Sequence, residues 1–331
     1  MAQSPTPTVG STLQRGLSRF FAGLAGGPAS LFFPTSSGGP PAEVYLRRSE
    51  KLSLLSLTVL VVLTWVGRPP AVAGPIASFA AVAAAVLVLA RLGRGSRIWV
   101  LARDFFPVLV IVVMFGALEP IIVAVNPARW DATFAAVDAR FFSGLVESWR
   151  GFLGRPARFT DGVYLVYLSY YVFPIAVGVA IRLSRSSAEF EETTFIVLAS
   201  FYACYLGYFL FPTSGPRLSD AESVFLGGGA ISEASRAFLR VAEGNHLDAF
   251  PSGHTGVSLV TLVVGWRLLS RWRAWLVAWA GAIVFATVYI HVHYVIDVVV
   301  GTAVAFAVLL LEVPAVRQCA RAVEPGSLAS P

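Results

Sequence analysis

Residues 254–270, with the sequence HTGVSLVTLVVGWRLLS, and residues 274–291, with the sequence AWLVAWAGAIVFATVYIH, decide the fold. Each stretch is apolar along nearly its whole length, and the short turn between them carries Arg271 and Arg273. A helix rises about 1.5 Å per residue, so such runs suit the roughly 30 Å hydrocarbon core of a bilayer. Because only a helix satisfies its own backbone polar groups in lipid one segment at a time, the two stretches predict antiparallel transmembrane helices.

The rest of the chain repeats this pattern. Hydrophobic residues make up 56% of the 331 residues and charged residues only 13%, and the mean hydropathy is +0.71. A single water-soluble core cannot hide an apolar excess of this size, because a soluble protein still needs a polar surface. The sequence therefore predicts an all-α membrane protein with about eight transmembrane helices and a helical-bundle core. The predicted helices lie near residues 52–67, 71–90, 99–124, 160–181, 193–211, 254–270, 274–291 and 293–315.

The basic residues orient these helices. The net charge is +6, and arginines gather in short connections at the ends of the apolar runs. Nucleic-acid-binding proteins instead cluster their basic residues on one polar face, so no nucleic-acid partner is expected. With eight spans the arginine clusters fall on one side, which the positive-inside rule assigns to the cytoplasm together with both termini. The long connections, residues 126–159 and 212–253, then lie on the extracytoplasmic side.

This topology divides the chain into five segments. The beginning is rich in Pro, Gly, Ser and Thr, which is typical of a flexible tail, whereas aromatic residues among mixed charges in the first long connection indicate an interfacial helix. The expected segments are a cytoplasmic tail at 1–50, N-terminal transmembrane helices at 51–125, an extracytoplasmic interfacial segment at 126–159, a helical bundle carrying the site at 160–315, and a cytoplasmic tail at 316–331.

All four histidines map to the predicted extracytoplasmic side. They are His246, His254, His291 and His293. His254 ends the stretch Phe250-Pro251-Ser252-Gly253-His254, in which Pro and Ser suit the first turn of a helix and Gly lets a ligand approach the backbone. Free N–H groups at a helix start, together with the helix dipole, favour binding of a phosphate. This stretch is therefore a candidate anion site.

A second stretch adds a paired histidine. In His293-Tyr294-Val295-Ile296-Asp297, the spacing of four residues places His293 and Asp297 on one helix face. A carboxylate beside an imidazole fixes its tautomer and stabilises its charged form. The predicted helix pair between the two stretches returns His293 to the membrane face where His254 lies. Two such histidines suit attack on phosphorus by one and protonation of the leaving oxygen by the other.

These stretches resemble the second and third motifs of the type-2 phosphatidic acid phosphatase superfamily, and residues 211–217, FPTSGPR, resemble a variant of its first motif. That variant, together with His291-Val292-His293-Tyr294, is most similar to the branch that contains fungal inositol phosphorylceramide synthase. The resemblance covers about residues 160–315. It implies phosphoryl transfer through a phosphohistidine, without a metal or other cofactor, on a lipid phosphate or phospholipid. The acceptor would be water or an alcohol or polyol such as inositol.

The resemblance also assigns roles to individual residues. His293 would be the nucleophile, Asp297 its orienting partner, and His254 the general acid and later the base. Arg217, Ser252 and the backbone of Gly253 would hold the phosphate oxygens, a role that suits arginine because its planar group binds two oxygens at once. The candidate pocket residues are His291, Tyr289 and His246.

Three features depart from the family pattern, and one is that Pro216 precedes Arg217, whereas the first motif has the arginine before the proline. Leu210 stands where the first motif has a lysine, and Thr287 stands where the third motif has an arginine. The candidates for the missing cations are Arg158, Arg236, Arg240 and His246. Two other classes of protein stay open: a transporter or flippase that uses His and Asp as a proton relay, and an inactive membrane scaffold.

Several further polar residues allow two interpretations. Arg103 and Asp104 are expected to pair or to reach the cytoplasmic surface, and Glu119 to face the site or to pack between helices. Asn245, His246 and Asp248 are expected to be solvated loop residues. The tyrosines 164, 167, 170 and 171 are expected to be an interfacial and packing set, or else to line a headgroup pocket.

Overall fold

The computed structural model of the chain describes residues 45–93, 95–143, 148, 152, 156–216, 228–242 and 245–323, and it describes no side chains at 240–242 and 311–323. Within these ranges the structure is helical and has no strand, which confirms the predicted all-α class. The helices are α2 (Arg48–Gly67), α3 (Ala73–Leu92), α4 (Arg97–Gly116), α5 (Leu118–Val125), α6 (Asp131–Phe141), α8 (Ala157–Leu168), η2 (Ser169–Tyr171), α9 (Phe173–Ser184), α10 (Ser187–Leu210), α12 (Ala230–Ala242), α13 (Gly253–Leu268), η4 (Ser270–Trp272), α14 (Arg273–Tyr289) and α15 (Val295–Val323).

The predicted count of eight transmembrane helices is not confirmed. In the described part of the chain, five helices are long and apolar enough to cross a membrane: α2, α3, α4, α10, and α14 with the preceding η4. Residues 157–184 make a sixth candidate, bent by 51° between η2 and α9. Helix α13 has only 16 residues, and the apolar part of α15 whose side chains are described ends at Leu310. Both helices begin close to buried polar residues of the candidate site. Several apolar helices nevertheless indicate an integral membrane protein.

Two of the predicted runs are not single straight helices. The run predicted near 99–124 divides into α4 and α5 at Ala117, and α4 contains Pro107, which removes one backbone hydrogen bond. The run predicted near 160–181 divides into α8, η2 and α9. In this second run Tyr170 and Tyr171 lie at the bend, so the break places aromatic side chains beside the candidate site.

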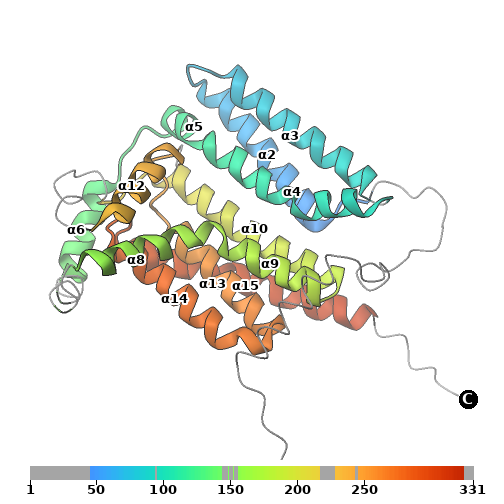
Figure 1. Cartoon of the computed structure of the whole chain (residues 1–331). Helices are drawn as coiled ribbons and strands as arrows, with labels where there is room; N and C mark the ends of the chain where they lie inside the picture. The colour runs from blue at the N-terminus through green and yellow to red at the C-terminus, as the bar shows by residue number, and fades with distance from the viewer. Residues whose placement is uncertain are drawn as a thin grey trace, which may run out of the picture. The chain divides into compact units, whose positions relative to one another are not determined.

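Helix α10 lies between the N-terminal helices and the C-terminal ones. It contacts α2 and α4 on one side and α13 and α15 on the other, as Figure 1 shows for the yellow helix between the blue-to-teal and orange-to-red groups. Glycines permit the close approach on the C-terminal side. A Cβ atom at Gly207 would lie 2.1 Å from Cδ of Pro251, and one at Gly301 would lie 2.5 Å from the carbonyl oxygen of Ser252. These contacts fix the start of α13 against α10 and α15.

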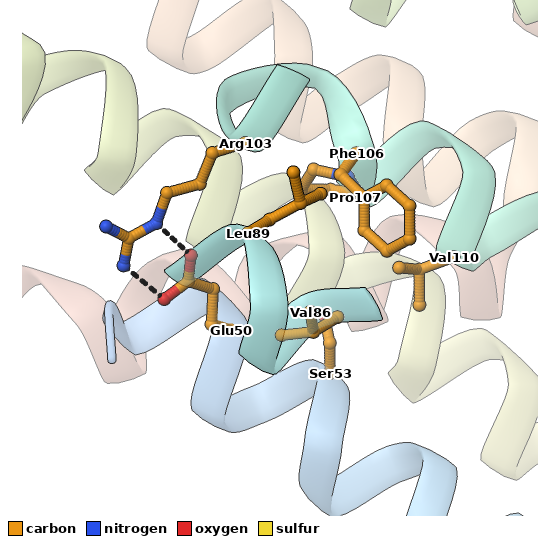
Figure 2. Close-up of a pocket in the computed structure, with 8 residues that line it drawn as sticks. All are labelled: Glu50, Ser53, Val86, Leu89, Arg103, Phe106, Pro107 and Val110. Atoms are coloured by element: carbon orange, nitrogen blue, oxygen red, sulfur yellow. Dashed lines mark hydrogen bonds and ion pairs between the residues drawn. The ribbon is translucent and has the colours of Figure 1, made fainter. Parts of the chain in front are cut away.

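A charged network joins the N-terminal helices to the rest. The Nε of Arg103 lies 2.5 Å from a carboxylate oxygen of Glu50, and a second bond of 2.7 Å makes the pair bidentate (Figure 2). Asp104 binds Arg47 of the α2 N-cap at 2.7 Å and Arg182 of α9 at 2.6 Å. Arg103 and Asp104 therefore pair with other helices rather than with each other. A small cavity of about 10 Å³ lies beside the Arg103–Glu50 pair.

Candidate functional site

Two histidines from different helices meet at the centre of the site. His254 lies in the first turn of α13, and His293 lies in the short connection just before α15. The Nε2 of His293 is 3.2 Å from the Nδ1 of His254. His254 is 8% exposed and His293 is 5% exposed, so both imidazoles lie in a site that largely excludes water. The α13–α14 hairpin thus brings the two motifs together, as their spacing in the sequence predicted.

The other ring nitrogen of His293 has two oxygen neighbours. Its Nδ1 lies 2.9 Å from the carbonyl oxygen of Ala249 and 3.4 Å from a carboxylate oxygen of Asp297. Because a carbonyl oxygen only accepts, Nδ1 carries the hydrogen, and the lone pair of a neutral His293 is on Nε2. In turn the Nδ1 of His254 is the donor in the contact between the two rings. This arrangement gives His293 the tautomer that a nucleophile needs.

Asp297 is held in place by the backbone around it. It is fully buried, and the carboxylate oxygen nearest His293 also accepts the backbone N–H of Tyr294 at 2.9 Å. Its own carbonyl oxygen accepts the N–H of Ser252 at 3.0 Å, which ties the start of α15 to the start of α13. The carboxylate therefore approaches His293 in a geometry that two helix starts determine.

The start of α13 presents backbone N–H groups to the same region. The hydroxyl oxygen of Ser252 accepts the N–H of Thr255 at 3.2 Å, so Ser252 is the N-cap. Gly253 follows, and a Cβ atom there would lie 2.7 Å from the hydroxyl oxygen of Tyr208. The first N–H groups of a helix have no partner within it and favour an anion. Ser252 thus lies at the helix start as the sequence predicted, and an anion site at Ser252 and Gly253 stays a prediction.

Tyrosines from the end of α8 and from η2 enclose His254. The ring of Tyr167 stacks on the imidazole at 4.6 Å between centroids, and Tyr170 lies at 4.1 Å. Tyr170 and Tyr171 also line a cavity that contains His254. Tyr170 and Tyr171 thus fit the interpretation that these tyrosines line a pocket. Tyr164 instead packs in an apolar cluster under Arg236.

One face of α6 touches all three motif segments. A carboxylate oxygen of Asp131 accepts the N–H groups of Ser214 and Gly215 at 2.9 and 3.0 Å, in the first-motif segment. Phe134 stacks on Phe250 with centroids 4.2 Å apart, beside the second motif. Asp138 accepts the first two N–H groups of α15, those of Val295 at 2.7 Å and Ile296 at 3.0 Å. Burial raises the pKa of Asp138, although these N–H groups and the nearby His291 act in the opposite direction.

The structure describes three of the four remaining predicted residues. Arg217 falls outside the described residues. Tyr289 packs against α8, where its hydroxyl lies 3.2 Å from that of Thr160. The ring of His246 is half exposed and bonds Glu119 of α5 at 2.9 Å, so Glu119 ties α5 to the loop before α13. His291 takes the left-handed backbone conformation, with φ of 58°, in the turn before α15.

The candidate replacement cations are spread over the bundle. Arg236 lies over the ring of Tyr164, with its Cζ 5.4 Å from the centroid, and Arg158 is exposed. The side chain of Arg240 falls outside the described ones. None of the described contacts of Arg158, Arg236 or His246 joins them to the paired histidines.

Sequence reasoning missed several residues near the site. Asn245 and Asp248 are buried, which corrects the expectation of a solvated loop, and Asp248 lines the cavity that holds His254. The loop is pulled inward because the Oδ1 of Asn245 accepts the N–H of Leu247 and the N–H of Ala249 bonds Thr213. The seven-residue spacing of Asp131 and Asp138, which places both on one helix face, was a signal that could have identified the role of α6.

Comparisons with known proteins agree with the superfamily. Among the described residues, no group of three or more His, Cys, Asp or Glu side chains is placed to hold a metal ion. No curated protein and no solved structure matches the chain significantly. The family profile of the PAP2 superfamily matches residues 132–311, from α6 into α15, without indicating the inositol phosphorylceramide synthase-like branch. Because this match covers more than half of the 331 residues, the chain belongs to the PAP2 superfamily, whose members are phosphatases or phosphotransferases.

Proposed function

We propose that this protein transfers a phosphoryl group from a lipid phosphate or phospholipid, without a metal, through a phosphohistidine on His293. The observation that carries the proposal is the contact between the Nε2 of His293 and the Nδ1 of His254 at 3.2 Å. In this contact the Nε2 of His293 carries a lone pair, and the Nδ1–H of His254 is the donor beside it. Few structural roles require two buried histidines in that relation.

The first step forms a bond between the Nε2 of His293 and phosphorus, and the bond from phosphorus to the lipid oxygen breaks. A protonated His254 gives its proton to that leaving oxygen, which departs as an alcohol. As positive charge develops on His293, the carbonyl of Ala249 and the carboxylate of Asp297 stabilise it through Nδ1–H. The reacting phosphorus must lie at the Nε2 of His293, so substrate binding has to separate the two rings.

The second step reverses these roles. The neutral His254 removes a proton from the acceptor, the acceptor oxygen attacks phosphorus, and the bond to His293 breaks. With a lipid phosphate as donor, water as acceptor releases inorganic phosphate, and an alcohol or polyol such as inositol gives a new phosphomonoester. With a phosphodiester as donor, water releases a phosphomonoester, and the alcohol gives a new phosphodiester. The resemblance to the inositol phosphorylceramide synthase branch supports transfer, and exclusion of water from the buried site favours it.

Phosphate oxygens are held by the start of α13 in this proposal. The N–H groups following Ser252 supply fixed donors, and Gly253 lets the phosphate approach them. Arg217 supplies the charge, as its place in the first-motif segment implies. The site would open on the extracytoplasmic side, because the arginine-rich connections lie at the opposite ends of the helices from His254 and His293.

The test uses purified protein in EDTA with a panel of lipid phosphates and phospholipids, each with and without inositol. Free phosphate, the new phosphomonoester and the new phosphodiester are measured separately. We expect turnover by the wild type, and loss of at least about 1000-fold in His293→Ala, because the covalent route is removed. Labelled phosphate should remain on the wild-type protein after acid-free denaturation and be absent from His293→Ala. Turnover that survives unchanged in His293→Ala would contradict the assignment of the nucleophile.

A further inference from the structure

A long cavity of about 520 Å³ runs from the candidate site along α10. One end is lined by Gly253 and His254, which belong to the proposed catalytic centre. The other end is lined by Asp104 and Phe190, close to the charged network at the opposite ends of the helices. Its volume is in the range of small-molecule sites, which is roughly 300–1000 Å³.

The wall of the cavity is largely apolar, and it is made by α4, α9 and α10. Its apolar lining includes Val108, Ile111, Ile175, Val197, Leu198 and Phe201. The polar groups at the far end already have partners: Asp104 binds two arginines, and the hydroxyls of Thr193 and Thr194 donate to carbonyl oxygens of their own helix at 2.8 and 2.9 Å. The far end therefore offers a ligand only apolar contacts.

The length of the cavity identifies the kind of ligand. Along α10 its lining extends from Phe190 to Tyr208, and 18 residues of helix at 1.5 Å each span about 27 Å. One leaflet contributes about half of a hydrocarbon core of roughly 30 Å, or about 15 Å. A hydrocarbon chain that starts at the site and fills the cavity therefore passes the midplane of the bilayer.

We propose that this cavity binds the hydrocarbon chain of the substrate, and that the substrate is a single-chain lipid phosphate whose chain is longer than one leaflet. This inference rests on the proposed function, since the phosphate would lie at His254 and His293. The inferred substrate is thus a long single-chain lipid, such as a polyprenyl phosphate. It is not a diacyl lipid, whose two chains each end near the midplane.

The far end of the cavity can be filled by one substitution. Gly178 of α9 lines it, and a Cβ atom there would have Phe190 as its nearest neighbour, at 4.0 Å. Gly178→Leu therefore adds bulk inside the cavity without a clash at the backbone. The matched control is Gly281→Leu on α14, because a Cβ at Gly281 meets nothing within 4 Å and Gly281 lies outside the cavity.

The experiment compares kcat/KM for a long polyprenyl phosphate, for farnesyl phosphate and for dioleoyl phosphatidic acid. We expect the wild type to prefer the long single chain by about tenfold or more. Gly178→Leu should remove that preference by lowering only the long-chain value, and Gly281→Leu should keep it. Equal or better use of the diacyl lipid by the wild type, or an equal loss on long and short chains in Gly178→Leu, would overturn the inference.

A binding measurement separates this inference from the catalytic proposal. A long single-chain lipid phosphate with a photoreactive group at its chain end is irradiated with the protein in bilayers, and the modified residues are mapped by mass spectrometry. Labelling of residues 190–198 and 175–178, competed by unlabelled long-chain lipid, supports the cavity even if no turnover occurs. Labelling confined to lipid-facing positions such as Leu206 would refute the chain site even if His293 proved to be catalytic.

Discussion

At the scale of single residues, the orientation of His293 depends on two acceptors of unequal strength. The Ala249 carbonyl is at 2.9 Å from Nδ1, and the Asp297 carboxylate is at 3.4 Å. The carbonyl is close enough to fix the tautomer without the carboxylate. In the proposed reaction the carboxylate would add a negative charge that stabilises the imidazolium of His293. Different groups therefore act on His293: the carbonyl of Ala249 fixes its tautomer, and the carboxylate of Asp297 supplies the negative charge.

Asp297→Asn separates the two contributions. The amide oxygen can still accept the N–H of Tyr294, and Ala249 still holds the tautomer, but the charge is lost. We expect kcat to fall about 100-fold with little change in KM, because the lost interaction strengthens only as charge develops. The matched control is Asp161→Asn, since Asp161 also accepts N–H groups at a helix start, those of Gly229 and Ser232. An unchanged kcat in Asp297→Asn would show that the carboxylate has no part in the reaction.

Gly215 shows a different kind of constraint. Its φ is +77°, and a Cβ atom there would lie 2.5 Å from the carbonyl oxygen of Val292, next to His293. Gly215→Ala should lower the free energy of unfolding by about 1–3 kcal/mol, from left-handed strain and the clash, and should displace the loop before α15. Gly281→Ala is the control, because it fills open space in a helix and should be neutral or slightly stabilising. Thermal unfolding in detergent measures both, and equal unfolding temperatures would contradict the constraint.

At the scale of elements, α6 holds the start of α15 through Asp138. Asp138 provides the acceptor for two N–H groups at the start of α15, two residues after His293. Asp138→Ala removes it, so the first turn of α15 should become less ordered and Asp297 less well placed. We expect kcat to fall about tenfold with KM nearly unchanged, and Asp138→Asn, which keeps an acceptor, to recover part of the rate. Equal kcat in wild type and Asp138→Ala would show that Asp138 of α6 does not position Asp297.

The raised pKa of Asp138 gives this contact a pH dependence. Because burial makes the folded protein bind the proton more tightly than the unfolded chain does, unfolding releases a proton between the two pKa values. The contribution of Asp138 to stability is thus fully present below its unfolded pKa, near 3.8, and declines as pH rises through the higher folded value. Relative to Asp138→Asn, the wild type should lose stability as pH rises through that window. If the free energies of unfolding of the two proteins differ by the same amount at every pH, the pKa of Asp138 is not raised in the folded protein.

At the scale of the whole molecule, the sequence predicts what depends on spacing and apolar length. Each predicted apolar run contains a helix. Asp297 approaches His293 at 3.4 Å as predicted, but His293 precedes α15, so the prediction that both lie on one helix face is wrong. The sequence could not predict contacts that only packing creates. The Asp138 bond to Val295 joins positions 157 residues apart, and the cavity exists because α4 stands away from α9 and α10 beside it. The predicted count of eight spans is not confirmed, because among the described residues α13, with 16 residues, is shorter than a typical span.

The buried ion pairs between α2 and α4 provide the last test. Arg103 and Glu50 are each less than 10% exposed in their side chains, so losing one partner leaves a charge without its counterion in a low-dielectric interior. We expect Glu50→Leu to lower the free energy of unfolding by about 3–5 kcal/mol, whereas Glu50→Leu with Arg103→Met should recover most of that loss, because apolar replacement of a whole buried pair is often neutral. Thermal unfolding of the wild type, both single variants and the double variant in lipid nanodiscs gives the coupling energy. Additive losses would mean that the two side chains act independently, and that the Arg103–Glu50 pair does not hold α2 against α4.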